Sequence, residues 1–126
     1  MNARNPLVNL FSKTFDRPSD LLCCAFGLKT SEIDVYITLL AGPSSIKDIA
    51  QKIDVDRTTV LRALKNLQKL KLVSEPERKT LEHGGYYDEY QAVSASDVRS
   101  QLLNQLEHWY KRTRKFLLER WASEIE

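Results

Sequence analysis

The sequence has 126 residues and a mass of 14.6 kDa, enough for one domain with a modest extension. Its 42% hydrophobic and 29% charged residues are typical of globular proteins, which excludes a disordered chain or a collagen. The longest apolar stretch, from Leu21 to Phe26, is far shorter than the roughly 20 residues of a membrane-spanning helix, and no signal-peptide pattern occurs. We therefore expect a cytoplasmic protein without a membrane partner.

The net charge of +2 is unevenly distributed along the chain. Residues 57–71 carry five basic side chains and no acidic one, whereas residues 72–91 carry two basic and five acidic side chains. A compact basic block without acids is the electrostatic pattern of a nucleic-acid-binding element. A solvated helix face gives the same pattern, so the block needs a structural context before it indicates function.

Residues 1–18 are predicted to form an N-terminal amphipathic segment. Leu7, Phe11 and Phe15 recur at helical spacing before Pro18 interrupts the pattern. An apolar stripe of this kind is expected to pack on another part of the protein.

A short helix is predicted next, with Ser19 as its cap and Gly27 as its left-handed end. It contains the adjacent cysteines Cys23 and Cys24, which can close only a strained ring and lack a C-x-x-C spacing. Small hydrophobic residues packed on a helix in a reducing compartment explain them, with a redox sensor as the alternative.

The following helix opens at Thr30 or Ser31 and is stopped by Gly42 and Pro43. Its predicted apolar stripe consists of Ile33, Tyr36, Ile37 and Leu40.

Two further helices complete a helix-turn-helix pattern. The first runs from Ile46 to Ile53 with Ser45 as its cap, and the turn is formed by residues 54–56. The second runs from Arg57 to Leu70 with Asp56 as its cap. Its predicted buried residues are Val60, Leu64 and Leu67, which leaves the basic side chains facing outward.

The sequence pattern then changes to that of a β-hairpin. Residues 72–75 and 86–93 are predicted strands, and Pro76, Gly84 and Gly85 supply the turn between them. The fold class is therefore mainly α with a small β-hairpin wing.

A helix of about 30 residues is predicted from Ala95 to Ile125, with Ser96 as its cap. Such a helix is about 45 Å long, too long for a small domain to cover, so we expect it to pair with a second copy. The expected dimerisation residues are Val98, Leu102, Leu106, Trp109, Phe116, Leu117 and Trp121.

At this point the chain resembles the winged helix-turn-helix domain of the archaeal TrmB-like transcription regulators. The resemblance covers about half of the chain. The segments that carry it are 27–28, 31–36, 42–43, 46–50, 55–60, 64–67, 72–73 and 90–93. It implies a winged helix-turn-helix domain over residues 19–93 and a C-terminal dimerisation helix over residues 94–126, as in short archaeal regulators that dimerise through such helices.

Two departures from the family pattern affect what the resemblance implies. The larger TrmB-type proteins continue into a sugar-binding domain, whereas this sequence continues into a long helix, so the resemblance gives no ground for a sugar or other small-molecule effector. Lys71 stands where the family usually has Gly, so it is expected to adopt the left-handed conformation at a cost of about 1 kcal/mol.

The basic helix supplies the candidate DNA-binding residues. The N-terminal part of a recognition helix enters the major groove, where an arginine fork matches guanine and a threonine reaches a base or a phosphate. We expect base contacts from Arg57, Thr58, Thr59 and Arg62. We expect phosphate contacts from Ser45, Lys47, Lys65 and Lys69. In the wing, Arg78 and Lys79 are weaker candidates because carboxylates surround them.

The sequence contains no catalytic or nucleotide-binding motif and no metal-ligand spacing, so we expect neither an enzyme nor a cofactor or metal. The expected function is that of a homodimeric, sequence-specific regulator bound to double-stranded DNA at the nucleoid, acting as a repressor or a chromatin-associated regulator. The alternative is a winged-helix protein interaction module of a transcription or other multi-subunit assembly. The acidic wing and the low net charge keep this alternative open.

Overall fold

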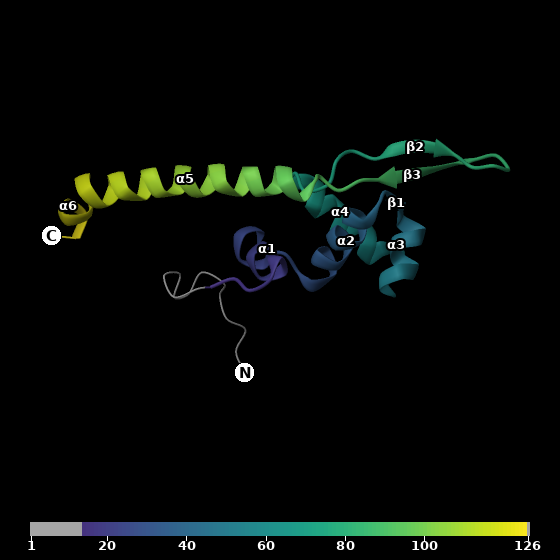
Figure 1. The fold of residues 1–126 in the computed structure, drawn as a ribbon, viewed down its shortest axis with the longest axis horizontal. Helices are drawn as coiled ribbons and strands as arrows, with labels where there is room; N and C mark the ends of the chain where they lie inside the picture. Colours follow the sequence, from purple (N-terminus) through teal and green to yellow (C-terminus); the bar gives the residue numbers. More distant parts are fainter. Residues whose placement is uncertain (1–13, 126) are drawn as a thin grey trace. The chain divides into compact units, whose positions relative to one another are not determined.

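The computed structural model describes residues 14–125, which form two compact units, one ending at Val93 and the other beginning at Ser94. Figure 1 shows helices and a small sheet in the first unit and a long helix with one further turn in the second. The first unit contains α1 (Pro18–Phe26), α2 (Thr30–Ala41), β1 (Ser44–Ser45), α3 (Ile46–Ile53), α4 (Arg57–Lys69), β2 (Glu77–Thr80) and β3 (Tyr86–Tyr90). The second contains α5 (Ala95–Glu119) and α6 (Trp121–Ile125). Leu7 and Phe11 of the predicted N-terminal segment lie outside the described residues.

The core of the first unit lies between α2, α3 and α4, which pack on one another. Its fully buried side chains are Val35, Ile49, Val60, Leu64, Leu67 and Leu72. All three residues that the sequence predicts as the buried face of α4 belong to this core, and Ala63 joins them. The predicted winged helix-turn-helix fold is confirmed.

The buried face of α2 differs from the predicted stripe. Val35, Tyr36 and Leu39 are buried, whereas Ile37 and Leu40 are 51% and 42% exposed. Only Tyr36 is buried among the four residues of the predicted stripe. The prediction was wrong because it followed apolar spacing alone, while the face that packs on α4 also carries a charged residue, Glu32.

Glu32 is the buried charged residue of this core, and both of its carboxylate oxygens accept hydrogen bonds. The backbone N–H of Lys29 donates to Oε1 at 2.8 Å and thereby caps α2, and Nδ2 of Asn66 donates to Oε2 at 2.7 Å. A buried carboxylate is tolerated only when its oxygens are satisfied in this way. The carboxylate therefore ties the start of α2 to α4.

A second polar contact joins α2 to the segment that follows β3. The Tyr36 hydroxyl donates to the backbone oxygen of Val93 at 3.1 Å. Burial raises the pKa of Tyr36, so the hydroxyl keeps the proton with which it donates.

Helix ends agree in part with the sequence. Gly27 adopts the predicted left-handed conformation with a φ of 66°. Lys71 does so with a φ of 65°, at the position where the family resemblance implies this conformation in a non-glycine residue. Ser19 is not a cap, because α1 already begins at Pro18, whose fixed φ suits the first helical position.

The sheet is antiparallel in the order β1-β3-β2 and forms the wing. The strand predicted over residues 72–75 was wrong: Val73 makes only an isolated bridge to Ala92, and regular pairing begins at Glu77. Pro76 lacks an N–H, and this interrupts the ladder. The hairpin turns over residues 81–85, where Gly84 and Gly85 have positive φ.

The second unit begins with a cap two residues earlier than the sequence indicates. Ser94, and not Ser96, accepts the N–H of Asp97 at 3.1 Å. The predicted single helix is interrupted at Arg120, whose φ of −125° and ψ of −20° separate α5 from α6. Within residues 14–125, no helix combines the length and the apolar composition that a membrane crossing requires.

Asn66→Ala is expected to destabilise the protein by about 1–3 kcal/mol, because it leaves a buried carboxylate oxygen of Glu32 without a donor. Urea unfolding at one fixed protein concentration measures the free energy of unfolding. Gln68→Ala is the matched control, since its side-chain hydrogen bond is exposed and 3.4 Å long. Equal stability of the two variants would contradict a role for the Glu32 to Asn66 bond.

Candidate nucleic-acid interface

Side-chain caps determine how α3 and α4 are joined. Ser45 Oγ accepts the N–H of Asp48 at 3.2 Å at the start of α3, and an Asp56 carboxylate oxygen accepts the N–H of Thr59 at 2.8 Å at the start of α4. Between the helices, Asp54 reverses the chain in the left-handed conformation with a φ of 56°. Both predicted caps and the predicted turn are confirmed, and they fix the first residues of α4.

The Asp56 carboxyl has a lowered pKa. The hydrogen bond from the Thr59 side chain is the main cause, followed by the bond from the Thr59 backbone and by the positive charge of Arg62. The group is therefore ionised at neutral pH, and its negative charge lies at the positive end of the helix dipole.

The face of α4 opposite its buried side chains is basic. Arg57, Thr58, Arg62, Lys65 and Lys69 are exposed, and Thr59 is half-buried. Spacings of four, three and four residues place Thr58, Arg62, Lys65 and Lys69 on one face of the helix, while Arg57 lies at its edge. Within residues 14–125, neither the three cations of this face nor Arg57 at its edge forms an ion pair. Thr58, Arg62, Lys65 and Lys69 thus share one exposed face of α4, with Arg57 at one edge of it and the half-buried Thr59 at the other.

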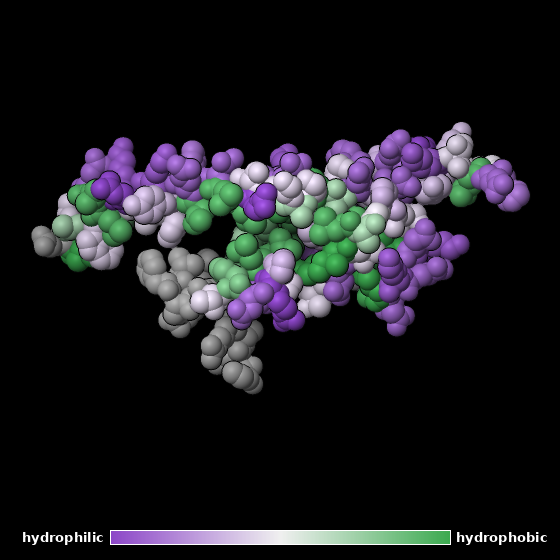
Figure 2. Space-filling view, in the orientation of Figure 1, coloured by the Kyte–Doolittle hydropathy of each residue, from purple (hydrophilic) through white to green (hydrophobic). Residues whose placement is uncertain are grey.

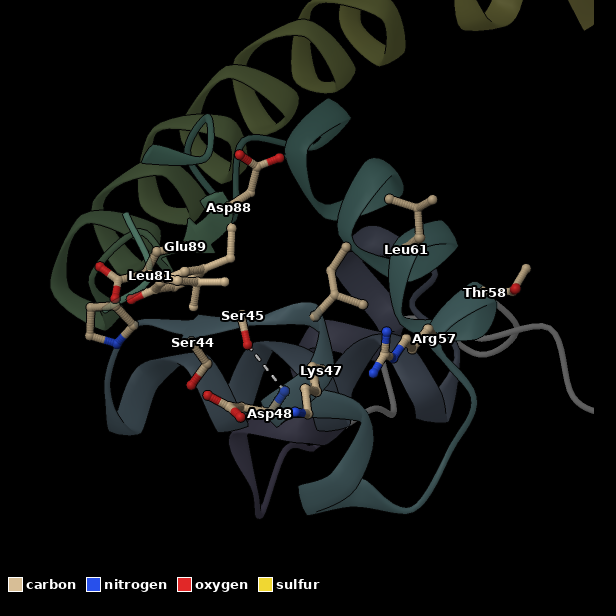
Figure 3. A pocket seen from close by; sticks show the side chains of 13 residues that line it. Ser44, Ser45, Lys47, Asp48, Arg57, Thr58, Leu61, Leu81, Asp88 and Glu89 are labelled. Atoms are coloured by element: carbon tan, nitrogen blue, oxygen red, sulfur yellow. Dashed lines mark hydrogen bonds between the residues drawn. The ribbon is translucent and has the colours of Figure 1, made fainter. Parts of the chain in front are cut away.

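An open groove of about 760 Å³ lies beside this face, between the start of α3, the start of α4 and the wing. Figure 3 shows Lys47 and Arg57 on one side of it and Asp88 and Glu89 of β3 on the other. Ser45 also lines the groove, and its hydroxyl oxygen accepts a hydrogen bond from the N–H of Asp48. The structure therefore brings Ser45 and Lys47 to the same groove as Arg57 and Thr58, while Arg62, Lys65 and Lys69 do not line it.

The two basic residues of the wing are in a different electrostatic state. Arg78 lies 3.8 Å from Asp88 and over the ring of Tyr86, and Lys79 lies 3.2 Å from Glu77 and 4.0 Å from Glu89. The hydrogen bond to Glu77 is the main cause of the raised pKa of Lys79. Their charges are thus largely neutralised within the wing, unlike the charges of α4.

Sequence reasoning missed Leu61 and the acidic side of the groove. Leu61 is half-buried and lines the groove between the exposed and buried faces of α4. The feature of the sequence that could have identified Leu61 is that it is an apolar residue of the basic helix outside the spacing of the core residues. Such a side chain is suited to contact a thymine methyl group. The sequence places carboxylates around the wing cations, but the position of Asp88 and Glu89 across the groove from Arg57 depends on the pairing of β3 with β1.

The predicted dimerisation residues of α5 and α6 form a partly exposed apolar stripe. Val98 is buried and Leu102 half-buried, whereas Leu106, Trp109, Phe116, Leu117 and Trp121 are between 40% and 60% exposed. Figure 2 shows apolar side chains along one edge of the C-terminal half of α5 and charged side chains along the other. Leu102, Leu106, Trp109, Thr113 and Phe116 alternate at spacings of four and three residues, the heptad pattern of a helix-pairing seam.

The chain is similar to known proteins over most of its length. The family described as "Sugar-specific transcriptional regulator TrmB" matches residues 22–96. Uncharacterized protein MJ1503 of Methanocaldococcus jannaschii is 37% identical over 114 residues, which are 90% of this chain and 80% of that protein. Uncharacterized protein MJ1082 of the same organism is 39% identical over 99 residues, 78% of this chain and 81% of that protein.

A solved structure shares the fold. It is described as a possible transcriptional regulator from Methanosarcina mazei Go1 and has a TM-score of 0.71 at 21% identity, with 86% of this chain and 96% of that chain covered. This likeness concerns the fold alone.

Thr59→Ala is expected to raise the pKa of Asp56 toward its ordinary value of 3.8, because it removes the largest cause of the lowered pKa. The lowered pKa stabilises the folded state above about pH 3.8, and this contribution is lost as the pH falls through the folded-state pKa. NMR titration of the Asp56 carboxyl carbon measures the change. Arg62→Ala is the control with a smaller expected shift, and a larger shift for Arg62→Ala than for Thr59→Ala would contradict this account.

Proposed function

The chain belongs to the TrmB family of transcriptional regulators, and we propose that it binds double-stranded DNA sequence-specifically as a homodimer, acting as a repressor or a chromatin-associated regulator. Family membership makes it a DNA-binding regulator of transcription. The proposal adds which residues contact the operator, that the protein is a homodimer, and the sign of regulation. A regulator of this kind acts in the cytoplasm, at the nucleoid.

The observation that carries the proposal is the contrast between α4 and the wing. The cations of α4 are exposed and, within residues 14–125, without ion pairs, whereas Arg78 and Lys79 are paired with carboxylates. Binding to phosphates releases counterions from the DNA, and a cation without a carboxylate partner contributes without first breaking an ion pair. The face of α4 is therefore the preferred surface for DNA.

We assign base contacts and phosphate contacts to different parts of α4. Arg57, Thr58, Thr59 and Arg62 occupy its first two turns, the part of a recognition helix that reaches base edges in the major groove. Lys65 and Lys69 follow toward its C-terminal end, where the phosphate backbone is the expected contact. Ser45 and Lys47 at the start of α3 are assigned to phosphates, and Arg78 and Lys79 of the wing to secondary contacts.

A homodimer is supported by the apolar stripe on α5. Trp109 and Phe116 are 41% and 40% exposed, and Leu106 is 60% exposed. Large apolar side chains at heptad spacing favour the pairing of helices, because burial in the interface removes their surface from water. A symmetric dimer presents two recognition helices to a palindromic site.

Arg57→Ala and Arg62→Ala are each expected to weaken binding to the preferred site by about 1–3 kcal/mol and binding to random DNA much less, because they remove base contacts. Lys69→Ala is expected to weaken binding to all sequences similarly and to lower the log–log salt slope by about 1 per subunit. Gel-shift titrations of genomic and random fragments at two salt concentrations measure both effects.

Lys52→Ala is the matched control, since it removes an exposed cation of α3 that does not line the groove. Equal losses on all sequences for the two arginine variants would assign them to phosphates instead of bases. Failure of the unaltered protein to bind any fragment below about 10⁻⁵ M at low salt would favour the protein interaction module.

Trp109→Glu and Phe116→Glu are expected to convert the dimer to a monomer, because each places a charge in the apolar stripe. Light scattering should give twice the mass of 14.6 kDa for the unaltered chain and the single mass for these variants. Leu118→Glu is the matched control, because Leu118 is 68% exposed and lies on the opposite side of α5. A dimer that survives the first two substitutions would place the interface elsewhere.

A further inference from the structure

A shallow depression interrupts the apolar stripe of α5 where a small side chain lies between two aromatic ones. It has a volume of about 230 Å³ and is lined by Trp109, Arg112, Thr113 and Phe116. These four positions, at i, i+3, i+4 and i+7, are the arrangement that receives a side chain of the facing helix in a coiled coil. A cavity of about 150 Å³ accepts a benzene molecule, so this depression has room for a phenyl ring.

The orientation of the facing helix decides which side chain reaches this depression. In a parallel pair in register, identical residues face each other, so Thr113 meets the partner subunit's Thr113 and leaves most of the depression empty. In an antiparallel pair centred between Arg114 and Lys115, the partner subunit's Phe116 faces the depression. The antiparallel pair places a large side chain opposite a small one, which is the arrangement that fills a helix interface.

The charges beside the stripe favour the same orientation. Arg112 and Glu119 are seven residues apart on one edge of the stripe, and within residues 14–125 neither forms an ion pair, although the neighbouring Lys111 and Arg120 do. In the antiparallel pair, Arg112 of each copy lies beside the partner subunit's Glu119, which gives two symmetric pairs of opposite charge. In a parallel pair, Arg112 faces an apolar position, the partner subunit's Leu117.

We propose that two copies of this chain pair through antiparallel α5 helices, with Phe116 of each copy in the Thr113 depression of the other and Arg112 beside the partner subunit's Glu119. The inference rests on the homodimer of the proposed function and adds its geometry. The helical overlap within α5 runs from Tyr110 to Glu119, about 15 Å, and uses the C-terminal half of the apolar stripe. Because each copy contributes the same surface to the interface, the assembly is complete with two subunits.

A charge-swap cycle on the full chain tests this arrangement. Arg112→Glu and Glu119→Arg should each weaken the dimer roughly tenfold, because each turns two attractive pairs into repulsive ones. The double variant Arg112→Glu/Glu119→Arg should restore the dimer to within about twofold of the unaltered chain. Sedimentation equilibrium measures the dissociation constants, and circular dichroism checks that each variant is folded.

Arg114→Glu is the matched control, since Arg114 lies on the side of α5 away from the stripe and should leave the dissociation constant within about twofold. A second measurement is independent of charge. Leu102→Cys, in a chain with Cys23→Ser and Cys24→Ser, should form no intersubunit disulfide, because the two copies of residue 102 are about 37 Å apart along the antiparallel pair.

The outcomes separate this inference from the proposed function. Rescue by the double variant without a disulfide at residue 102 supports the antiparallel pair. Losses that simply add in the double variant, or a disulfide at residue 102, overturn the antiparallel pair while the homodimer itself stands. A monomeric unaltered chain overturns the homodimer and this inference together.

Discussion

The apolar face of α4 packs against α2 and α3, and this burial sets the orientation of the helix. The buried side chains of this face are Val60, Ala63, Leu64 and Leu67. A helix with one face buried has only its opposite face free, so the position of the core determines which side chains of α4 meet solvent. Glu32 adds a directional contact, because its bond from Asn66 fixes α4 against the start of α2. The basic surface is thus a consequence of how the apolar face is packed.

Electrostatics then distinguishes the two elements beside the groove. The wing has cations and carboxylates on adjacent strands, and antiparallel pairing brings Arg78 opposite Asp88, where the charges offset each other. On α4 no carboxylate lies among the cations, so their field extends into solvent. A polyanion that approaches the groove meets attraction on the α3 and α4 side and carboxylates on the β3 side, which favours binding along the helix over binding along the wing.

The second unit follows a different rule. A single helix has no core of its own, and α5 leaves Trp109 and Phe116 about two-fifths exposed with a small residue between them. Apolar surface at heptad spacing is stabilised by another helix, and the alternation of large and small side chains selects among the ways in which that helix can lie. In the proposed homodimer, packing against a second copy sets both the existence of the helix pair and its direction.

Local chemistry was sufficient for the sequence to determine the helix-turn-helix, its caps at Ser45 and Asp56 and the buried face of α4, because each depends on neighbours within a few residues. The left-handed Lys71 was instead implied by the family resemblance. The tertiary structure alone decided which face of α2 is buried, since Glu32 finds its partner 34 residues away on α4. The tertiary structure also decided that the first strand of the hairpin begins at Glu77, after Pro76, and that Asp88 and Glu89 lie across the groove from Arg57. Both features depend on the pairing between segments that are distant in the sequence.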